Sequence, residues 1–255
     1  MPGPIKISVV IITYNEEKNI GRCLESVREL ADEIVVVDSF SKDKTKEIAL
    51  HYGAKWIENK FEGHVEQKNF ALDQAKYSHV LSLDADEALS EELKTSIQEI
   101  KENCDSESYS MNRLSSYCGQ WIRYCGWYPD KKVRFVNRHK ARWGGDNPHD
   151  KLIPKEQGTI HLKGDILHYT YYTISEHIRQ VDYFTDIAAM ASYRKGKKSN
   201  LFLILTSPVF RFFKSYFIKR GFLDGYYGFV VCSIQAFSNF SKYVKLLELN
   251  KKFKV

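Results

Sequence analysis

His79-Val80-Leu81-Ser82-Leu83-Asp84-Ala85-Asp86 combines a short apolar run with two carboxylates placed around one small residue. The apolar run has the length and composition of a buried strand, and the carboxylates fall on the turn that follows it. Two carboxylates on such a turn can together reach a ligand and a hard cation, because Mg²⁺ and Mn²⁺ prefer oxygen ligands. Asp-x-Asp also occurs in many solvated surface turns, so its meaning here depends on the surrounding sequence.

Strand-like and helix-like segments alternate around this stretch over the first hundred residues. Strands are expected at 7–12, 33–37, 55–57 and 79–83, and helices after Asn15 and over 41–52, 65–76 and 90–101. Strands separated by helices of this length are typical of a parallel sheet. The sequence therefore predicts an α/β fold with a Rossmann-like, mostly parallel, doubly wound sheet.

Polar residues follow three of the expected strands directly. Thr13-Tyr14-Asn15 follows the first, Asp38 ends the second, and Asp84-Ala85-Asp86 follows the fourth. In a doubly wound sheet, ligands bind beyond the carboxyl ends of the strands. The predicted sheet thus brings three separate polar clusters to one edge.

This edge has the residue types of a nucleotide site. Asp38 can accept a hydrogen bond from the N–H of a base such as uracil, and the Tyr14 ring can stack on a base. The alternative is that Tyr14 only packs and that Asn15 only caps the next helix, with Glu16 and Glu17 in its first turn.

Two further side chains are candidates for the same site. Lys68 lies on the helix before the fourth strand, where its cation can meet a diphosphate, or it is a solvated helix lysine. His168 lies in the strand-like run Ile166-Leu167-His168-Tyr169. It can supply a nitrogen ligand to a metal ion, or it is a packed histidine.

The stretch Trp143-Gly144-Gly145-Asp146-Asn147-Pro148-His149-Asp150 is the second informative one. Its paired glycines permit close approach of the backbone to a ligand. Asp150 is then the candidate general base that deprotonates an acceptor hydroxyl. The alternative is an ordinary turn, since Gly, Asp, Asn and Pro are common turn residues.

Composition limits the class of protein. The chain has 255 residues, of which 43% are hydrophobic and 27% charged, as in globular proteins. The net charge of +6 suits an anionic ligand or an anionic membrane surface, without implying nucleic acid. Five cysteines without a CxxC pair predict free thiols and neither a disulfide framework nor a zinc site.

The C-terminal part of the sequence has a different character. We expect one domain over residues 1–172 and a helical region over 173–255, with a linker at 195–200. Residues 201–210 are apolar, and Arg211, Lys214, Lys219 and Arg220 are then interleaved with aromatic residues. Such a mixture is typical of a segment at a membrane surface. The alternative is a helical hairpin packed on the catalytic domain.

Localisation is expected to be cytoplasmic, with attachment to the inner face of the cytoplasmic membrane as an option. The N-terminus has no cationic start followed by an apolar stretch, as a secretion signal would have. No uninterrupted apolar segment approaches the ~20 residues that span a bilayer. We expect no nucleic acid as a partner, because the basic residues stay local and no nucleic-acid motif is present.

Taken together, these residues resemble glycosyltransferase family 2, the inverting enzymes of the GT-A fold. The resemblance covers about residues 5–170, and its motifs occur in order: Thr-Tyr-Asn-Glu, Val-Asp-Ser and Leu-Asp-Ala-Asp-Glu, each after a strand. The run Phe217-Ile218-Lys219-Arg220-Gly221-Phe222-Leu223-Asp224-Gly225 is similar to the tail of one branch, the bacterial lipopolysaccharide core β-glucosyl- and galactosyltransferases.

The resemblance implies a role for each matching residue. Lys68 would face the diphosphate, and Asp84, with Ala85 beside it, would contact the ribose or the metal. Asp86 and His168 would bind the metal, Mg²⁺ or Mn²⁺. Asp150 falls where the family's catalytic carboxylate is expected, although the family often has Glu-Asp where this chain has His149-Asp150. The uridine part of the donor would be held by Thr13, Tyr14, Asn15, Glu16 and Asp38.

The expected function is a metal-dependent, inverting transfer of a hexose from a UDP-sugar to a saccharide or glycolipid acceptor, in lipopolysaccharide or cell-envelope glycan biosynthesis. An alternative hypothesis is that the protein is a nucleotidyltransferase. Such an enzyme normally needs a basic, Gly-rich loop where this chain has Thr13-Tyr14-Asn15-Glu16-Glu17. A rival from another class is a non-catalytic module that binds sugar or a membrane surface.

Overall fold

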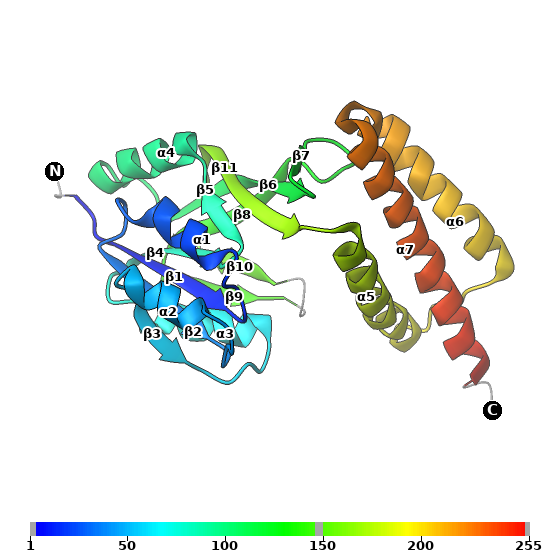
Figure 1. The fold of residues 1–255 in the computed structure, drawn as a ribbon, viewed down its shortest axis with the longest axis horizontal. Coiled ribbons are helices and arrows are strands. Elements are labelled where there is room, and N and C mark those ends of the chain that lie inside the picture. The colour runs from blue at the N-terminus through cyan, green and yellow to red at the C-terminus, as the bar shows by residue number, and fades with distance from the viewer. Residues whose placement is uncertain (1–3, 146–149, 253–255) are drawn as a thin grey trace. The chain divides into compact units, whose positions relative to one another are not determined.

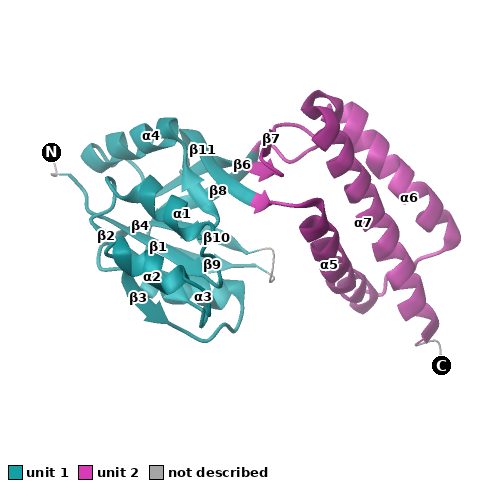
Figure 2. Cartoon of the chain, in the orientation of Figure 1, with its two compact units in different colours: residues 1–114, 130–169 teal, residues 115–129, 170–255 magenta. Residues whose placement is uncertain are grey.

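The computed structural model describes residues 4–145 and 150–252. The chain divides into two compact units (Figure 2). Unit 1 comprises residues 1–114 and 130–169, and unit 2 comprises residues 115–129 and 170–255. Residues 115–129, which we expected within a domain spanning 1–172, thus group with the helical C-terminal part.

Unit 1 is built around a mixed sheet in the order β3-β2-β1-β4-β8-β6-β11-β5 (Figure 1). The first four strands in this order are parallel, and the pairs β4–β8, β8–β6 and β11–β5 are antiparallel. The strands are β1 (Ile7–Thr13), β2 (Glu33–Asp38), β3 (Lys55–Glu58), β4 (His79–Asp84), β5 (Glu87–Leu89), β6 (Ser108–Tyr117), β8 (Asp130–Asn137) and β11 (Ile160–Tyr171). The α/β prediction is confirmed, and the parallel pairs β3–β2, β2–β1 and β1–β4 lie together in one half of the sheet.

Helices and a small hairpin cover the two faces of this sheet. Alternate residues of β1 divide between two cores, since Val9 packs with α1, α2 and α4, and Val10 packs with α3, β9 and β10. This division follows from the period of two along a strand. The covering elements are α1 (Ile20–Val27), α2 (Thr45–His51), α3 (His64–Gln74), α4 (Glu91–Glu102), β9 (Ala141–Gly144) and β10 (Lys151–Pro154).

The first helix begins later than we expected, and Asn15 does not cap it. Helix α1 begins at Ile20, and Asn15 has a left-handed backbone with φ 55°. The N–H of Asn15 donates to Ser41 Oγ at 2.7 Å, and its Oδ1 accepts the N–H of Lys42 at 2.8 Å. Asn15 therefore ties the loop after β1 to the loop after β2, which is why it is unavailable as a helix cap.

Unit 2 contains the short strand β7 (Gln120–Ile122) and the helices α5 (Ile174–Arg194), α6 (Leu201–Phe213) and α7 (Gly225–Lys252). A π-helical turn (Lys214–Ile218) and a 3₁₀ turn (Gly221–Asp224) connect the last two helices. Helix α5 begins with a capping box in which Thr173 and Glu176 each accept the other's N–H. The helical C-terminal region agrees with the sequence prediction, whereas residues 195–200, which we expected to be a linker, connect α5 and α6 within unit 2.

The tail motif around Gly221 and Asp224 organises unit 2 through close backbone contacts. The buried Asp224 carboxylate accepts the N–H groups of Arg123 and Tyr124 at 3.1 and 2.8 Å. A Cβ on Gly228 would lie 2.0 Å from the carbonyl oxygen of Gly221 and 2.8 Å from Cβ of Asp224. The glycines of this motif therefore serve close packing of the last helix against the turn before it.

Replacement of Gly228 by alanine is expected to destabilise the protein by about 2–3 kcal/mol, because a backbone oxygen cannot yield to the added methyl group. Urea unfolding followed by tryptophan fluorescence measures this change. The matched control is Gly21→Ala on α1, where the added Cβ would lie 3.5 Å from Ile48 Cγ2. There alanine should be neutral or stabilise by about 0.5–1 kcal/mol through helix propensity. Equal stability of the two variants would contradict this interpretation of the motif.

One stretch of unit 2, Leu201–Ile218, is long and apolar enough to cross a membrane by length and composition alone, and little of it is buried. Our expectation concerned uninterrupted apolar segments, and this stretch meets the criterion of length and composition although it contains charged residues. Pro208 and the two charges Arg211 and Lys214 interrupt the stretch, but the helix continues through the proline.

Candidate active site

Strand register brings the three polar clusters of the sequence to one edge of the sheet. Thr13 at the end of β1 is the partner of Asp38 at the end of β2. On the other side of β1, Ile12 is the partner of Asp84 at the end of β4. The three strands are parallel, so their carboxyl ends, and the loops that follow, meet at this edge.

The loop side of this edge is pre-shaped by hydrogen bonds. The buried Asp38 carboxylate accepts the N–H of Ser41 at 2.7 Å and also the hydroxyl of Ser41. Thr13 Oγ1 is buried and has no hydrogen-bond partner among the described residues. Tyr14 is 57% exposed, so its ring is free to stack on a planar ligand. Asp38 is thus held rigidly, with the exposed ring of Tyr14 at the same edge.

The pKa of Glu16, at the same edge, is raised by burial. Burial raises the pKa of its carboxyl to about 7, with Asp86, Asp43 and Asp84 adding to the rise. Its Oε2 accepts the Nδ2–H of Asn19 at 2.7 Å, which opposes the shift. Burial is the main cause of the rise, and the three neighbouring carboxylates show that negative charge gathers at this edge, which favours a cation there.

Lys68 on α3 contacts both the Asp84 turn and the predicted base Asp150. Its Nζ lies 3.0 Å from Asp84 Oδ1 and 2.8 Å from Asp150 Oδ2, and its side chain is almost completely buried. The same Nζ lies 4.4 Å from the centroid of the Trp143 ring, within range of a cation–π interaction. The structure therefore brings Lys68, Asp84 and Asp150 together, whereas solvation of Lys68 as a surface lysine is excluded.

Two further charged residues, Arg134 and Glu87, contact Asp84, and we assigned no role to either from the sequence. Arg134 on β8 places Nη2 3.0 Å from Asp84 Oδ2 and 2.9 Å from Glu87 Oε1. Glu87 is completely buried, and its Oε2 accepts the N–H of Asp84 at 3.0 Å. A signal was present, because Arg134 is the single charge within the apolar run Val133–Val136. We call Lys68, Asp84, Glu87, Arg134 and Asp150 the ion cluster.

The ion cluster sets the ionisation of its members. Burial by itself would raise the pKa of the Asp84 carboxyl, but Lys68 and Arg134 outweigh it and hold this pKa well below its ordinary value. Burial would likewise lower the pKa of Arg134, but Glu87 and Asp84 raise it. Asp84 is therefore an anion throughout the physiological range.

Asp86 is paired differently from Asp84. Its Oδ2 lies 3.1 Å from Nε2 of His168 on β11, and its carbonyl oxygen accepts the N–H of Tyr169 at 2.9 Å. A carboxylate oxygen and an imidazole nitrogen at this distance can bind one divalent cation. Within residues 4–145 and 150–252, no group of three or more His, Cys, Asp or Glu side chains is placed to hold a metal ion. The pair thus suits a metal ion whose other ligands are phosphate oxygens and waters.

The predicted base Asp150 lies just after residues 146–149, which are outside the described residues, as are the turn and the His149 that we singled out there. Before that stretch, Asn69 on α3 clamps the backbone of Trp143 on β9, since its amide accepts the N–H at 3.0 Å and donates to the C=O at 2.9 Å. Helix α3 thereby holds the hairpin next to Lys68.

Ala85, between the two aspartates, is buried.

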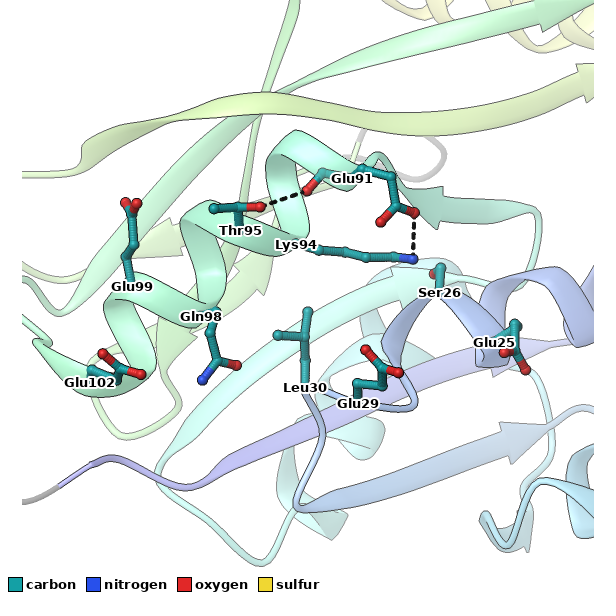
Figure 3. Close-up of a pocket in the computed structure, with 10 residues that line it drawn as sticks. All are labelled: Glu25, Ser26, Glu29, Leu30, Glu91, Lys94, Thr95, Gln98, Glu99 and Glu102. Atoms are coloured by element: carbon teal, nitrogen blue, oxygen red, sulfur yellow. Dashed lines mark hydrogen bonds and ion pairs between the residues drawn. The ribbon is translucent and has the colours of Figure 1, made fainter.

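A groove of about 840 Å³ lies elsewhere on unit 1, along α1 and α4 (Figure 3). Five glutamates line it, together with Lys94, whose Nζ pairs with Glu91 at 2.7 Å. None of the residues predicted for the active site lines this groove. The candidate site is therefore the edge with the ion cluster and not this groove.

The chain is similar to known proteins over most of its length. The family model described as Glycosyl transferase family 2 matches residues 8–151. An uncharacterised glycosyltransferase of Rickettsia typhi is 34% identical over 97% of this chain and 88% of its own length. The lipopolysaccharide core biosynthesis glycosyltransferase LpsC of Rhizobium meliloti is 26% identical over 89% of this chain and 86% of its own length.

One solved structure aligns over nearly the whole chain. It is a mannosyltransferase of Pyrobaculum calidifontis in complex with GDP-mannose and Mn²⁺, with a TM-score of 0.56. The alignment covers 97% of this chain and 90% of that chain, at 15% identity. At this identity the similarity supports the fold alone, and it extends through the helices of unit 2.

Proposed function

The chain belongs to glycosyl transferase family 2 and is a glycosyltransferase, and from this premise we propose that it transfers a hexose from a UDP-sugar to a saccharide or glycolipid acceptor. The observation that carries the proposal is the position of Lys68. Its ammonium contacts both Asp84, on the turn that would hold the donor, and Asp150, the candidate base. A donor diphosphate that reaches Lys68 would therefore arrive next to the base.

The proposed reaction is one direct displacement at the anomeric carbon. Asp150 accepts the proton of the acceptor hydroxyl as that oxygen attacks, and the bond from the anomeric carbon to the UDP oxygen breaks. Lys68 stabilises the negative charge that develops on the UDP leaving group. A single displacement inverts the configuration, so an α-linked UDP-sugar would give a β-linked product.

The donor would lie along the edge of the sheet. Thr13, Tyr14, Asn15 and Asp38 would hold the uridine, with Glu16 beside them. Asp84 would face the ribose, since its carboxylate already binds two cations of the chain. Asp86 and His168 would hold Mg²⁺ or Mn²⁺, which as a Lewis acid would stabilise the leaving group.

A screen of UDP- and GDP-sugars for metal-dependent hydrolysis tests this proposal without knowledge of the acceptor. We expect slow release of UDP from one UDP-hexose in the presence of Mn²⁺ or Mg²⁺. Release of pyrophosphate in place of UDP would favour a nucleotidyltransferase. Absence of both turnover and metal-dependent UDP binding would favour a non-catalytic module.

Lipopolysaccharide core or another cell-envelope glycan is the proposed acceptor class. The support is the relative LpsC, whose name assigns it to lipopolysaccharide core biosynthesis and which matches most of this chain. A glycolipid acceptor would lie in a membrane, so we propose a cytoplasmic enzyme that works at the inner face of the cytoplasmic membrane.

Helix α6 supports attachment to that surface. Its side chains Phe202, Val209 and Phe210 are 71%, 68% and 64% exposed. Arg211 lies in its last turn and Lys214 follows directly. Apolar side chains next to cations are typical of helices that lie in the interface of an anionic membrane.

The full-length protein is expected to sediment with vesicles containing anionic lipid at low salt, and the double variant Phe202→Ser/Phe210→Ser should lose most of this binding. Each buried aromatic side chain contributes about 1.5–3 kcal/mol. Tyr183→Ser, at an exposed tyrosine of α5, is the matched control and should bind like the parent. Equal sedimentation of the double variant and the parent would refute the role of α6.

A further inference from the structure

We propose that Arg134 is a positioning residue for the donor, because it neutralises Asp84 and so releases Lys68 to bind the diphosphate. This inference rests on the proposed function. Nothing in the similarity to known proteins assigns a role to Arg134, and the sequence motifs of the site do not include it.

Strand pairing explains how Arg134 reaches Asp84. Strand β8 runs antiparallel to β4, with Phe135 opposite Leu81 and Val136 opposite Val80. Arg134 therefore lies beside the carboxyl-terminal half of β4, from which Asp84 projects. The register of β8 with its other neighbour β6 shifts at Arg134, and the Arg134 guanidinium lies 5.1 Å from the centroid of the Trp143 ring, which also packs with Val136.

Arg134 and Glu87 hold both the side chain and the main chain of Asp84. Arg134 Nη2 bridges Asp84 Oδ2 and Glu87 Oε1, while Glu87 Oε2 accepts the N–H of Asp84. These contacts form a closed loop that links β8 to the end of β4 and to β5. The orientation of the Asp84 carboxylate is thus set before any donor arrives.

The ammonium of Lys68 has no N–H donor to spare for a further ligand. It has three N–H donors, and three carboxylate oxygens already lie within 3.2 Å of it: Oδ1 and Oδ2 of Asp84 at 3.0 and 3.2 Å, and Oδ2 of Asp150 at 2.8 Å. A diphosphate must take donors away from these carboxylates. Because Arg134 stays on Asp84, that carboxylate keeps a counter-ion when Lys68 turns to the donor. Without Arg134, Asp84 would compete with the diphosphate for Lys68.

The hydrogen bonds of Arg134 are unusual for a residue that only stabilises the fold. Arg134 is 3% exposed, yet its Nε and Nη1 have no hydrogen-bond partner within the described part of the chain. Buried N–H groups are almost always bonded, and the exceptions call for an explanation. Among the described residues the guanidinium bonds only through Nη2, to Asp84 and Glu87, and its bond to the site residue Asp84 points to a task at the site.

The competing explanation is that Arg134 only neutralises the buried Glu87. The two explanations separate in a background without that charge, since Glu87→Gln removes the carboxylate and keeps its volume. Arg134→Met in this background leaves no unpaired buried glutamate, so the double variant Glu87→Gln/Arg134→Met should fold. Its thermal unfolding, compared with Glu87→Gln alone, verifies this.

Calorimetry with UDP and Mn²⁺ then tests the inference in a double-mutant cycle with Lys68→Met, all in the Glu87→Gln background. We expect Arg134→Met to weaken UDP binding about 10–100-fold when Lys68 is present. In the Lys68→Met protein, Arg134→Met should weaken UDP binding less than about threefold. No lysine is then present for which Asp84 and the diphosphate could compete. Two residues that act through each other give such non-additive effects.

The outcomes distinguish this inference from the proposed function. If the parent chain binds no UDP with Mn²⁺, the proposed function fails and the inference fails with it. If UDP binds but Arg134→Met leaves its affinity unchanged, or weakens it equally with and without Lys68, the inference is overturned and the proposed function stands.

Discussion

Replacement of Asp150 by asparagine is expected to lower kcat by ~10²–10⁴-fold, the usual contribution of a general base. The amide keeps the size of the side chain but cannot accept the proton of the acceptor hydroxyl. The KM for the donor should stay the same or fall, because the neutral amide no longer holds Lys68, which lies 2.8 Å from the carboxylate in the parent. A fall in kcat without a rise in the donor KM would indicate loss of the chemical step alone.

Steady-state kinetics with the donor found in the hydrolysis screen measure this effect, and calorimetry with UDP and Mn²⁺ shows whether binding persists. The matched control is Asp73→Asn on α3, where the carboxylate is half-exposed and pairs with Arg142 at 2.6 Å. A surface pair of this kind contributes ~1 kcal/mol or less, so the control should be active. Near-normal turnover of Asp150→Asn would remove Asp150 from the mechanism.

Replacement of Asp86 by alanine is expected to lower kcat/KM for the donor by at least ~100-fold, since a bound metal supplies several kcal/mol of leaving-group stabilisation. The protein should still fold. The Asp86 side chain is partly exposed, and the bond from Tyr169 goes to its backbone carbonyl, which alanine keeps.

Binding of Mn²⁺, followed by electron paramagnetic resonance in the absence of donor, provides a readout independent of activity. Asp86→Ala and His168→Ala should each weaken it. His161→Ala is the control, because His161 lies on the same strand β11 but bonds to Ser110 Oγ at 3.1 Å. If both Asp86→Ala and His168→Ala bind Mn²⁺ like the parent, the pair does not hold the metal.

The sequence predicted the framework of the site because that framework depends on local patterns. Apolar runs and helical spacings each report on a single segment, and parallel strands always place their carboxyl ends together. Thr13, Asp38 and Asp84 could therefore be assigned to one edge from the sequence, and the register of β1 with β2 and β4 agrees. The capping role of Asn15 was wrong, because the same residue type also suits the bonds that tie its loop to Ser41 and Lys42.

What the sequence by itself determined is the α/β class, the strands that end in polar residues, and the helical C-terminal region. The tertiary structure alone decided which charges meet. Lys68 and Asp150 are 82 positions apart, and Arg134 reaches Asp84 only because β8 joins the sheet antiparallel to β4. No short-range pattern encodes such pairs, since burial and strand register create them once the chain has folded. The pairing of Asp84 with cations, and of Asp86 with His168, therefore belongs to the fold and not to the Asp-Ala-Asp motif.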